Sequence, residues 1–599
     1  MKQQVTLTTP SKMAETEITV AKYLQIRLEQ MGLSHLFGIA GNYTAPFLNT
    51  ILEDKKAKIE VINDTNEINA GHCADAYARL RGFSAVAVTY GVGAFTLLNS
   101  VAGSFVEHCP VLVINGAPTS SDQLKNIAQG MLASHMTGDM YSNINVYRNV
   151  TVAAEQVTSC IDASYKIDAV LDACILYGKP VYLEVFEDVW RMKCAPPIAP
   201  LIVKVLKGCK ENARKAAEHV AAMAVNKKII FWGGEEIQRY GIQKEFLELI
   251  EETDTEFVTS ILGKSIVSED HPNFKGVFNG NASPKDVKER FEKADLKICL
   301  GVWTTGKNLG GFDVWKDDTV LANHSGVRIG AGYEPNVSLK DFMIFLKEEL
   351  IKVKFKAFQM YGSRVLKSSF FVAGGISQAI KAEVPITFDL FFGRMNSFIN
   401  GSHVVISDAG FPLLGAQGIH ISEPNGFVAQ ASWLSIGYSV PAATGVKCAR
   451  PDKRAVVFVG DGAFQETCQA VSTQNKLKHN TIVFVLDNGI YGIEQMLVNP
   501  NPFRGKDKVD YDLPDLNTVY AYNDMHRWKY AKLVDVFGGK GFEVNNMDEL
   551  EDVLTQLDTI TENTIIHVHL PKTDIPEAIA YKNAKPGEDE FLNKKWSLC

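Results

Sequence analysis

Two polar residues that each follow an apolar run could together hold a cation. Asp461 lies between Gly460 and Gly462, just after the apolar run 455–459, and Asn488 follows the run 481–486 at a spacing of 27 residues. Carboxylate and amide oxygens are ligands that Mg²⁺ prefers. Glycines beside the acid leave room for a phosphate group, and the amides at the start of a following helix attract an anion. The spacing predicts a site for Mg²⁺ and a diphosphate, although Gly-Asp-Gly alone also occurs in plain turns.

This prediction requires that both polar residues lie at the ends of parallel strands. Short β-branched runs alternate with stretches of helical periodicity along the whole chain, which is typical of an α/β fold with helices on both faces of parallel sheets. Open sheets of this kind bind ligands at the carboxyl ends of their strands. We predict strands at 85–89, 111–114, 181–185, 228–232, 297–302, 404–406, 455–459, 481–486 and 564–568.

Two linkers divide the chain into three segments. The first is the Pro-rich stretch 194–200, which cannot continue a helix, and the second is a softer boundary at 352–368. We predict three doubly wound parallel-sheet domains, at residues 1–193, 201–355 and 365–599.

Several motifs in the right order resemble those of the thiamine diphosphate-dependent 2-oxo acid decarboxylases, a group that includes pyruvate and indolepyruvate decarboxylases. The segment 455–496 is similar to the cofactor-binding motif of that family. Further similar stretches are 37–42, 66–79, 89–94, 102–108, 271–277 and 435–437. The resemblance covers nearly the whole chain and implies a pyrimidine-binding, a middle and a diphosphate-binding domain.

The resemblance also implies a role for individual residues. Asp461, Asn488 and the carbonyl of Ile490 would hold Mg²⁺, and Glu67 would hydrogen-bond the aminopyrimidine ring of thiamine diphosphate. Ile436 would bend the cofactor and the carbonyl of Leu434 would accept its amino group, although Ile436 could equally be a core residue and Glu67 an exposed residue at a helix start. The remaining cofactor contacts implied are Gly460, Gly462, Ala463 and Tyr491.

The acid/base residues depart from the family pattern. Asn42 stands where these decarboxylases have Asp, and Ser134-His135 stands where they have a His pair, whereas Glu494 is retained. Asn does not titrate and Ser hardly does, so two proton-handling groups are missing. Losing such help typically costs ~10²–10⁴-fold in rate, which would slow aldehyde release after loss of CO₂. His135 could also be a surface histidine without a chemical role.

These departures favour one function and leave others open. Our first hypothesis is a carboligase that decarboxylates a pyruvate-like 2-oxo acid and joins the product to a carbonyl acceptor, giving a 2-hydroxyketone. The alternatives are a decarboxylase that releases an aldehyde, a non-catalytic regulatory homologue, and a flavin-binding synthase relative. Bulky residues at 411–414 indicate a reshaped substrate pocket, for which we predict Leu413, Ile493 and Leu497 as walls.

Composition excludes other classes of protein. The net charge of −8 argues against a nucleic-acid binder, and the apolar runs are too short to span a membrane. The polar start and the ten scattered cysteines, expected to be free thiols, favour a cytoplasmic protein. The family resemblance implies a homodimer or homotetramer with shared active sites.

Overall fold

The computed structural model describes residues 17–201, 207–353, 355, 385–504 and 518–582. These residues form two compact units. The first contains the described residues up to 74, 83–105 and 109–201, and the second contains 75–82, 106–108 and those from 207 onward. Each unit is described by itself.

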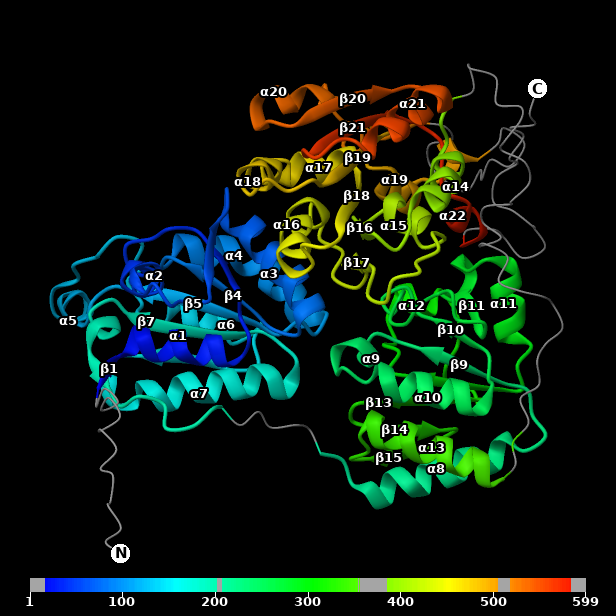
Figure 1. Ribbon diagram of the computed structural model, residues 1–599, viewed down its shortest axis with the longest axis horizontal. Coiled ribbons are helices and arrows are strands. Elements are labelled where there is room, and N and C mark those ends of the chain that lie inside the picture. The colour runs from blue at the N-terminus through cyan, green and yellow to red at the C-terminus, as the bar shows by residue number, and fades with distance from the viewer. Residues whose placement is uncertain (1–16, 202–206, 354, 356–384, 505–517, 583–599) are drawn as a thin grey trace, which may run out of the picture. The chain divides into compact units, whose positions relative to one another are not determined.

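The first unit is built on a six-stranded parallel sheet with the strand order β3-β2-β4-β5-β7-β6. Helices α1 and α7 lie side by side on one face of it (Figure 1). The short strands β1 (Ile18–Thr19) and β8 (Lys193–Cys194) pair antiparallel beside the sheet. The sheet strands are β2 (His35–Gly38), β3 (Glu60–Asn63), β4 (Ser84–Val88), β5 (Val111–Ala117), β6 (Ala154–Val157) and β7 (Val181–Phe186). The helices are α1 (Val20–Gln30), α2 (Ala45–Glu53), α3 (Glu67–Arg81), α4 (Val92–Val106), α5 (Ser120–Gln129), α6 (Ser142–Tyr147) and α7 (Cys160–Tyr177).

The second unit contains two sheets, of which the first has seven strands in the order β11-β10-β9-β12-β13-β14-β15. Its strands are β9 (Ile229–Gly233), β10 (Phe257–Thr259), β11 (Phe274–Val277), β12 (Leu296–Leu300), β13 (Thr319–Asn323), β14 (Gly326–Ile329) and β15 (Gly332–Pro335). Helices α8, α10 and α13 pack together against it. The helices of this part are α8 (Lys210–Ala224), α9 (Glu236–Arg239), α10 (Gln243–Thr253), α11 (Lys285–Glu292), α12 (Gly306–Leu309) and α13 (Leu339–Lys352).

The sequence led us to expect a fully parallel middle sheet, but two of its strands are antiparallel. Strands β14 and β15 add to its edge in the antiparallel sense. Only two residues join β13 to β14, and two join β14 to β15. A connection of two residues can close a hairpin but cannot make the crossover that parallel strands need.

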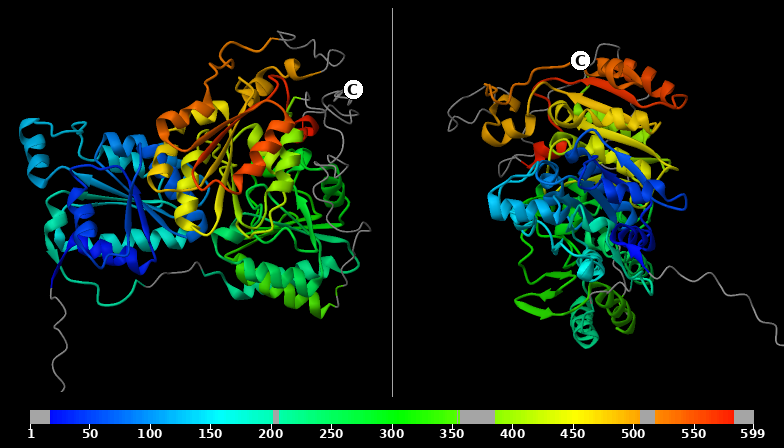
Figure 2. Two further views of the ribbon diagram at one scale, coloured as in Figure 1. Left: turned by 45° about the horizontal axis from the view of Figure 1, so that its top comes forward. Right: turned by 90° about the vertical axis from the view of Figure 1, so that its left-hand side faces the viewer.

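The remaining sheet has six parallel strands in the order β17-β16-β18-β19-β21-β20. Figure 2 shows its yellow-to-orange strands lying between helices. The strands are β16 (His403–Ser407), β17 (Phe427–Ala429), β18 (Arg454–Gly460), β19 (Ile482–Asp487), β20 (Lys540–Val544) and β21 (Thr564–His569). The helices are α14 (Phe388–Phe398), α15 (Phe411–Ala416), α16 (Ser439–Ala449), α17 (Asp461–Thr467), α18 (Ala470–Lys476), α19 (Gly492–Val498), α20 (Val534–Phe537), α21 (Met547–Leu557) and α22 (Glu577–Lys582).

The predicted fold class of three α/β domains is confirmed, with main sheets that are parallel apart from β14 and β15. Each predicted strand overlaps an observed one, with ends that differ by at most three residues. The first and last sheets also share one strand order, so each has a point where the order reverses between two neighbours. Such a switch point is where α/β sheets form their ligand crevice.

The exact domain boundaries stay predictions, and most of the second linker falls on residues outside those described. Among the described residues, no helix is both long and apolar enough to cross a membrane. The cysteines of the described part form no disulfide.

Candidate functional site

A pocket opens at the switch point of the last sheet, where β16, β18 and β19 end. Its walls are mainly the ends of β18 and β19 and the segments that follow the three strands, together with Ile436 and Phe388. It gathers nine of the residues that the sequence singled out: Ile436, Gly460, Asp461, Gly462, Ala463, Asn488, Ile490, Tyr491 and Ile493. The other lining residues are Phe388, Ala409, Gly410, Phe411, Pro412, Leu486 and Gly492. Strand order therefore places the two halves of the Gly-Asp-Gly and Asn motif beside each other.

Asp461 is the buried acid of this pocket, with 3% of its surface exposed. One carboxylate oxygen accepts a hydrogen bond from the Gly462 amide (3.0 Å) and the other from the Gly489 amide (2.8 Å). Burial and the nearby Asp487 carboxylate raise the pKa of Asp461. A carboxylate that is costly to ionise in isolation is stabilised by a bound cation, which supplies the missing charge.

Asn488 and Ile490 complete a set of oxygen donors. Both are buried, and the Asn488 Oδ1 accepts a bond from the Ile490 amide (3.3 Å). The Ile490 carbonyl accepts a bond from the Gly492 amide (2.8 Å) and keeps a second lone pair. A carboxylate, an amide and a carbonyl are hard oxygen ligands that fit Mg²⁺ or Ca²⁺ rather than a soft metal.

The two glycines of the motif serve different purposes. A Cβ at Gly460 would meet only the Cγ of Pro412 at 3.9 Å, so this glycine faces open space in the pocket. A Cβ at Gly462 would lie 2.4 Å from the Tyr491 ring. The expectation that both glycines clear a path for phosphate is thus supported at Gly460 only, because Gly462 is needed for the packing of Tyr491.

The turn that carries Leu434 and Ile436 is strained. Leu434 has a φ of 61°, a left-handed conformation that costs a residue with a side chain about 1–2 kcal/mol. Ile436 is 39% exposed and projects into the pocket wall. Backbone strain of this kind persists only where the surroundings over-determine it, and it clusters at functional sites.

Two fully buried carboxylates hold this turn, and the sequence reasoning assigned a role to neither. Glu107, which belongs to the second unit, accepts bonds from the amides of Ser432 (2.7 Å) and Trp433 (3.0 Å). Asp408 accepts from the Gly437 amide (3.1 Å) and, with its other oxygen, from the Ser439 amide (2.9 Å) and hydroxyl (2.7 Å). The sequence could have indicated Asp408, because it is an acidic residue directly after an apolar strand, as Asp461 is.

A second cluster lies in the first unit, at the carboxyl ends of its strands. Glu67 is half-buried at the start of α3. Gly93, at the start of α4, lies so close that a Cβ there would be 3.2 Å from the Glu67 Oε1. The glycine of the 89–94 motif therefore makes room for the Glu67 carboxylate.

The predicted acid/base residues of this unit come from neighbouring loops. The Tyr43 hydroxyl, next to Asn42, donates to the Ser134 carbonyl (3.1 Å), and the rings of Tyr43 and His135 lie 6.4 Å apart. His135 has a φ of 70°, and a Cβ at Gly91 would be 2.2 Å from its carbonyl oxygen. Asn42, Ser134 and His135 are all exposed. Tyr43 thus links the loop of Asn42 to the loop of Ser134 and His135.

The remaining predicted residues are distributed differently. Glu494 and Leu497 are exposed on α19, and Ile493, on the same helix, lines the pocket. Leu413 is fully buried in the core, and the neighbouring Phe411 and Pro412 form the pocket wall instead. Leu434 lies beside the pocket, not in its wall, with its side chain packed against the core.

Comparison with known proteins gives the family. Three models of thiamine pyrophosphate enzymes match the chain: the N-terminal TPP binding domain at residues 18–137, the central domain at 216–343 and the C-terminal TPP binding domain at 408–568. The chain belongs to the thiamine pyrophosphate enzymes. The cofactor of this family is thiamine pyrophosphate, also called thiamine diphosphate, and both clusters described above fall within its two binding domains.

Several curated proteins to which the chain is similar are decarboxylases that match almost end to end. Pyruvate decarboxylase isozyme 3 of Saccharomyces cerevisiae is 27% identical over 580 residues, 94% of this chain and 97% of the relative. A probable pyruvate decarboxylase of Schizosaccharomyces pombe is 28% identical over 568 residues, 93% and 94% of the two chains. The alpha-keto-acid decarboxylase of Mycobacterium tuberculosis is 28% identical over 569 residues, 94% and 96%. The chain is thus a member of the thiamine diphosphate-dependent 2-oxo acid decarboxylase family.

Proposed function

We propose that this protein uses thiamine diphosphate and Mg²⁺ to decarboxylate a 2-oxo acid without oxidation. The observation that carries this proposal is the pocket at the ends of β16, β18 and β19. It unites a buried acid, an amide and a carbonyl with an open glycine, in a chain whose similar proteins are pyruvate and alpha-keto-acid decarboxylases. When bound, thiamine diphosphate supplies the nucleophilic carbon and the electron sink that loss of CO₂ requires.

The protein's own residues bind and orient the reactants. Asp461, Asn488 and the Ile490 carbonyl would hold Mg²⁺, and the open space beside Gly460 leaves room for a diphosphate. The strained turn fixes the Leu434 carbonyl and the Ile436 side chain in one position, and Glu67 would hold a proton at the pyrimidine ring when the cofactor is bound. Phe411, Pro412 and Ile493 form apolar walls that exclude water from the reacting carboxylate.

Proton transfer depends on fewer groups than in the family pattern. His135 and Glu494 can both give and take a proton, whereas Asn42 and Ser134 only hold hydrogen bonds. This observation favours a second candidate, carboligation. If the proton needed for aldehyde release arrives slowly, a carbonyl acceptor can react first and yield a 2-hydroxyketone.

We expect a homodimer or homotetramer in which the N-terminal cluster of one subunit and the C-terminal cluster of the next form one site. Support comes from the family membership and from the division of the predicted residues between two compact units. The presence of Glu67, Asp461 and Asn488 argues against a non-catalytic regulatory role.

A product analysis tests the proposal. The protein is supplied with Mg²⁺, thiamine diphosphate and a panel of 2-oxo acids, with and without an added aldehyde, and CO₂, free aldehyde and 2-hydroxyketone are measured. CO₂ with an equal amount of aldehyde supports the decarboxylase, and CO₂ with 2-hydroxyketone supports the carboligase. No CO₂ from any 2-oxo acid would reject both.

A further inference from the structure

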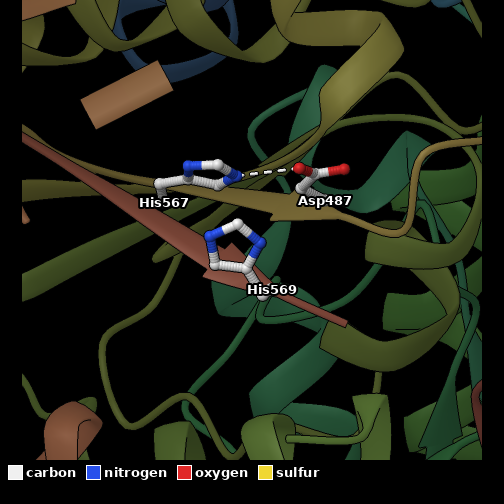
Figure 3. A group of neighbouring side chains, drawn as sticks. All are labelled: Asp487, His567 and His569. Atoms are coloured by element: carbon white, nitrogen blue, oxygen red, sulfur yellow. Dashed lines mark hydrogen bonds and ion pairs between the residues drawn. The ribbon is translucent and has the colours of Figure 1, made fainter. Parts of the chain in front are cut away.

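A group of metal-ligand side chains lies on one face of the last sheet, outside the predicted Mg²⁺ donor set. Asp487 ends β19, and His567 and His569 end β21 (Figure 3). One ligand atom from each lies within 4.8 Å of the others. Among the described residues this is the only such group of three.

Strand register explains why these side chains meet. In the parallel pair of β19 and β21, Asp487 is opposite His569, and His567 is two residues earlier on the same face. On the next strand, Glu543 is opposite His567. Four potential ligands or ligand partners therefore point from three adjacent strands to the same side of the sheet.

Hydrogen bonds orient both imidazoles. The His567 Nε2 bonds the Asp487 Oδ2 at 2.8 Å, so these two ligand atoms already converge, and the proton that they share is released to solvent when an ion binds. The His569 Nε2 bonds the Glu543 Oε1 at 2.9 Å, which leaves the Nδ1 of His569 for the group. A histidine whose second ring nitrogen is held by a carboxylate is the arrangement that metal-binding histidines usually show.

We propose that Asp487, His567 and His569 bind a divalent transition-metal ion of the Zn²⁺ type, with Glu543 orienting His569. Two imidazoles and one carboxylate suit Zn²⁺ and not Mg²⁺, which prefers oxygen ligands throughout. Three protein ligands leave one position of a tetrahedral ion for water. An ion with bonds of ~2.0–2.2 Å holds its ligands roughly 3.4 Å apart, so a small rotation of His569 closes the group.

The residues around the proposed site let a metal ion enter, and one of them limits its affinity. Asp487 and His567 are buried, but the side chains of His569 and Glu543 are 28% and 58% exposed, so an ion can arrive from their side. The Arg527 Nε lies 3.4 Å from the Asp487 Oδ1 and opposes a cation. Because Arg527 is 45% exposed, its guanidinium can move into water when an ion binds.

The test is zinc binding by the whole protein with saturating Mg²⁺ and thiamine diphosphate, so that the predicted Mg²⁺ site is filled. Equilibrium dialysis against Zn²⁺ gives the stoichiometry and affinity, and anomalous diffraction at the zinc edge from soaked crystals gives the position. We expect about one tightly bound Zn²⁺ per chain at Asp487, His567 and His569. Glu543→Gln should weaken it by ~10–100-fold.

The partly exposed His569 is the ligand to change, because substitution of the buried His567 could disturb folding. His569→Gln should abolish the tight site, and Arg527→Gln should strengthen it. The matched control is His420→Gln, since His420 also bonds a carboxylate, Asp270, at 2.7 Å but lies in no group of three. A zinc peak elsewhere, or unchanged zinc binding in His569→Gln, would overturn the proposal.

Discussion

The contact between Gly93 and Glu67 makes the position of the proposed catalytic carboxylate directly testable. In the variant Gly93→Ala, the new methyl group would lie 3.2 Å from the Glu67 Oε1 and 3.2 Å from the Thr89 Cγ2. Ordinary van der Waals contact spans 3.4–4 Å. The Glu67 carboxylate must therefore retreat by at least about 0.2 Å, the difference between 3.4 and 3.2 Å, and thus by a few tenths of an ångström.

A displacement of this size has a calculable effect on rate. A misplacement of ~1 Å can cost about 10²-fold, so a retreat of a few tenths of an ångström is expected to lower kcat by roughly 2- to 6-fold. Stability should not fall correspondingly, because alanine replaces glycine in the first turn of α4, where it is the better helix former. The methyl group would change kcat far more than the KM for the 2-oxo acid, since Glu67 acts on the cofactor.

The assay is CO₂ release at saturating thiamine diphosphate, Mg²⁺ and 2-oxo acid, with unfolding followed in parallel. The control variant is Gly306→Ala, which also introduces a methyl group at the start of a helix but meets nothing within 4 Å. It should keep full activity. If Gly93→Ala retained the parental kcat while Glu67→Gln was inactive, the close contact would not position the carboxylate and our reasoning would be wrong.

Three further variants test other parts of the account. In Asp408→Asn, an NH₂ donor replaces the oxygen that accepts two bonds from Ser439. We therefore expect the free energy of unfolding to fall by about 1–3 kcal/mol and the KM for thiamine diphosphate to rise. An unchanged KM would show that Asp408 does not position the turn. Burial, with a contribution from Arg454, lowers the pKa of His403 to about 4, below its unfolded value of 6.5. The contribution of neutral His403 to the free energy of unfolding is therefore complete above pH 6.5. It is lost as the pH falls towards 4, by about 3 kcal/mol in all. The variant His403→Gln should flatten the pH dependence of unfolding between these two pH values. Asn42→Asp supplies a titratable group and should raise the ratio of free aldehyde to 2-hydroxyketone; an unaltered ratio would indicate that position 42 does not control release.

Much of the C-terminal site could be predicted from sequence because its signals are local. An apolar strand followed by Gly460-Asp461-Gly462, and a second strand followed by Asn488, define the chemistry within a span of fewer than forty residues. The structure then places these residues, with Ile436, in one pocket. The pocket wall was harder to predict, because whether Leu413 or Phe411 faces the cavity depends on the orientation of the short helix α15.

The sequence alone determined the alternation of strands and helices, the fold class and the oxygen donors for a cation, because periodicity and residue type act over short stretches of chain. Only the tertiary structure decided which distant groups meet. The order of strands sets the bonds that Ser439 donates to Asp408 and the approach of His567 to Asp487, 80 positions away. Strand order depends on how whole elements pack, and no local pattern of residues encodes it.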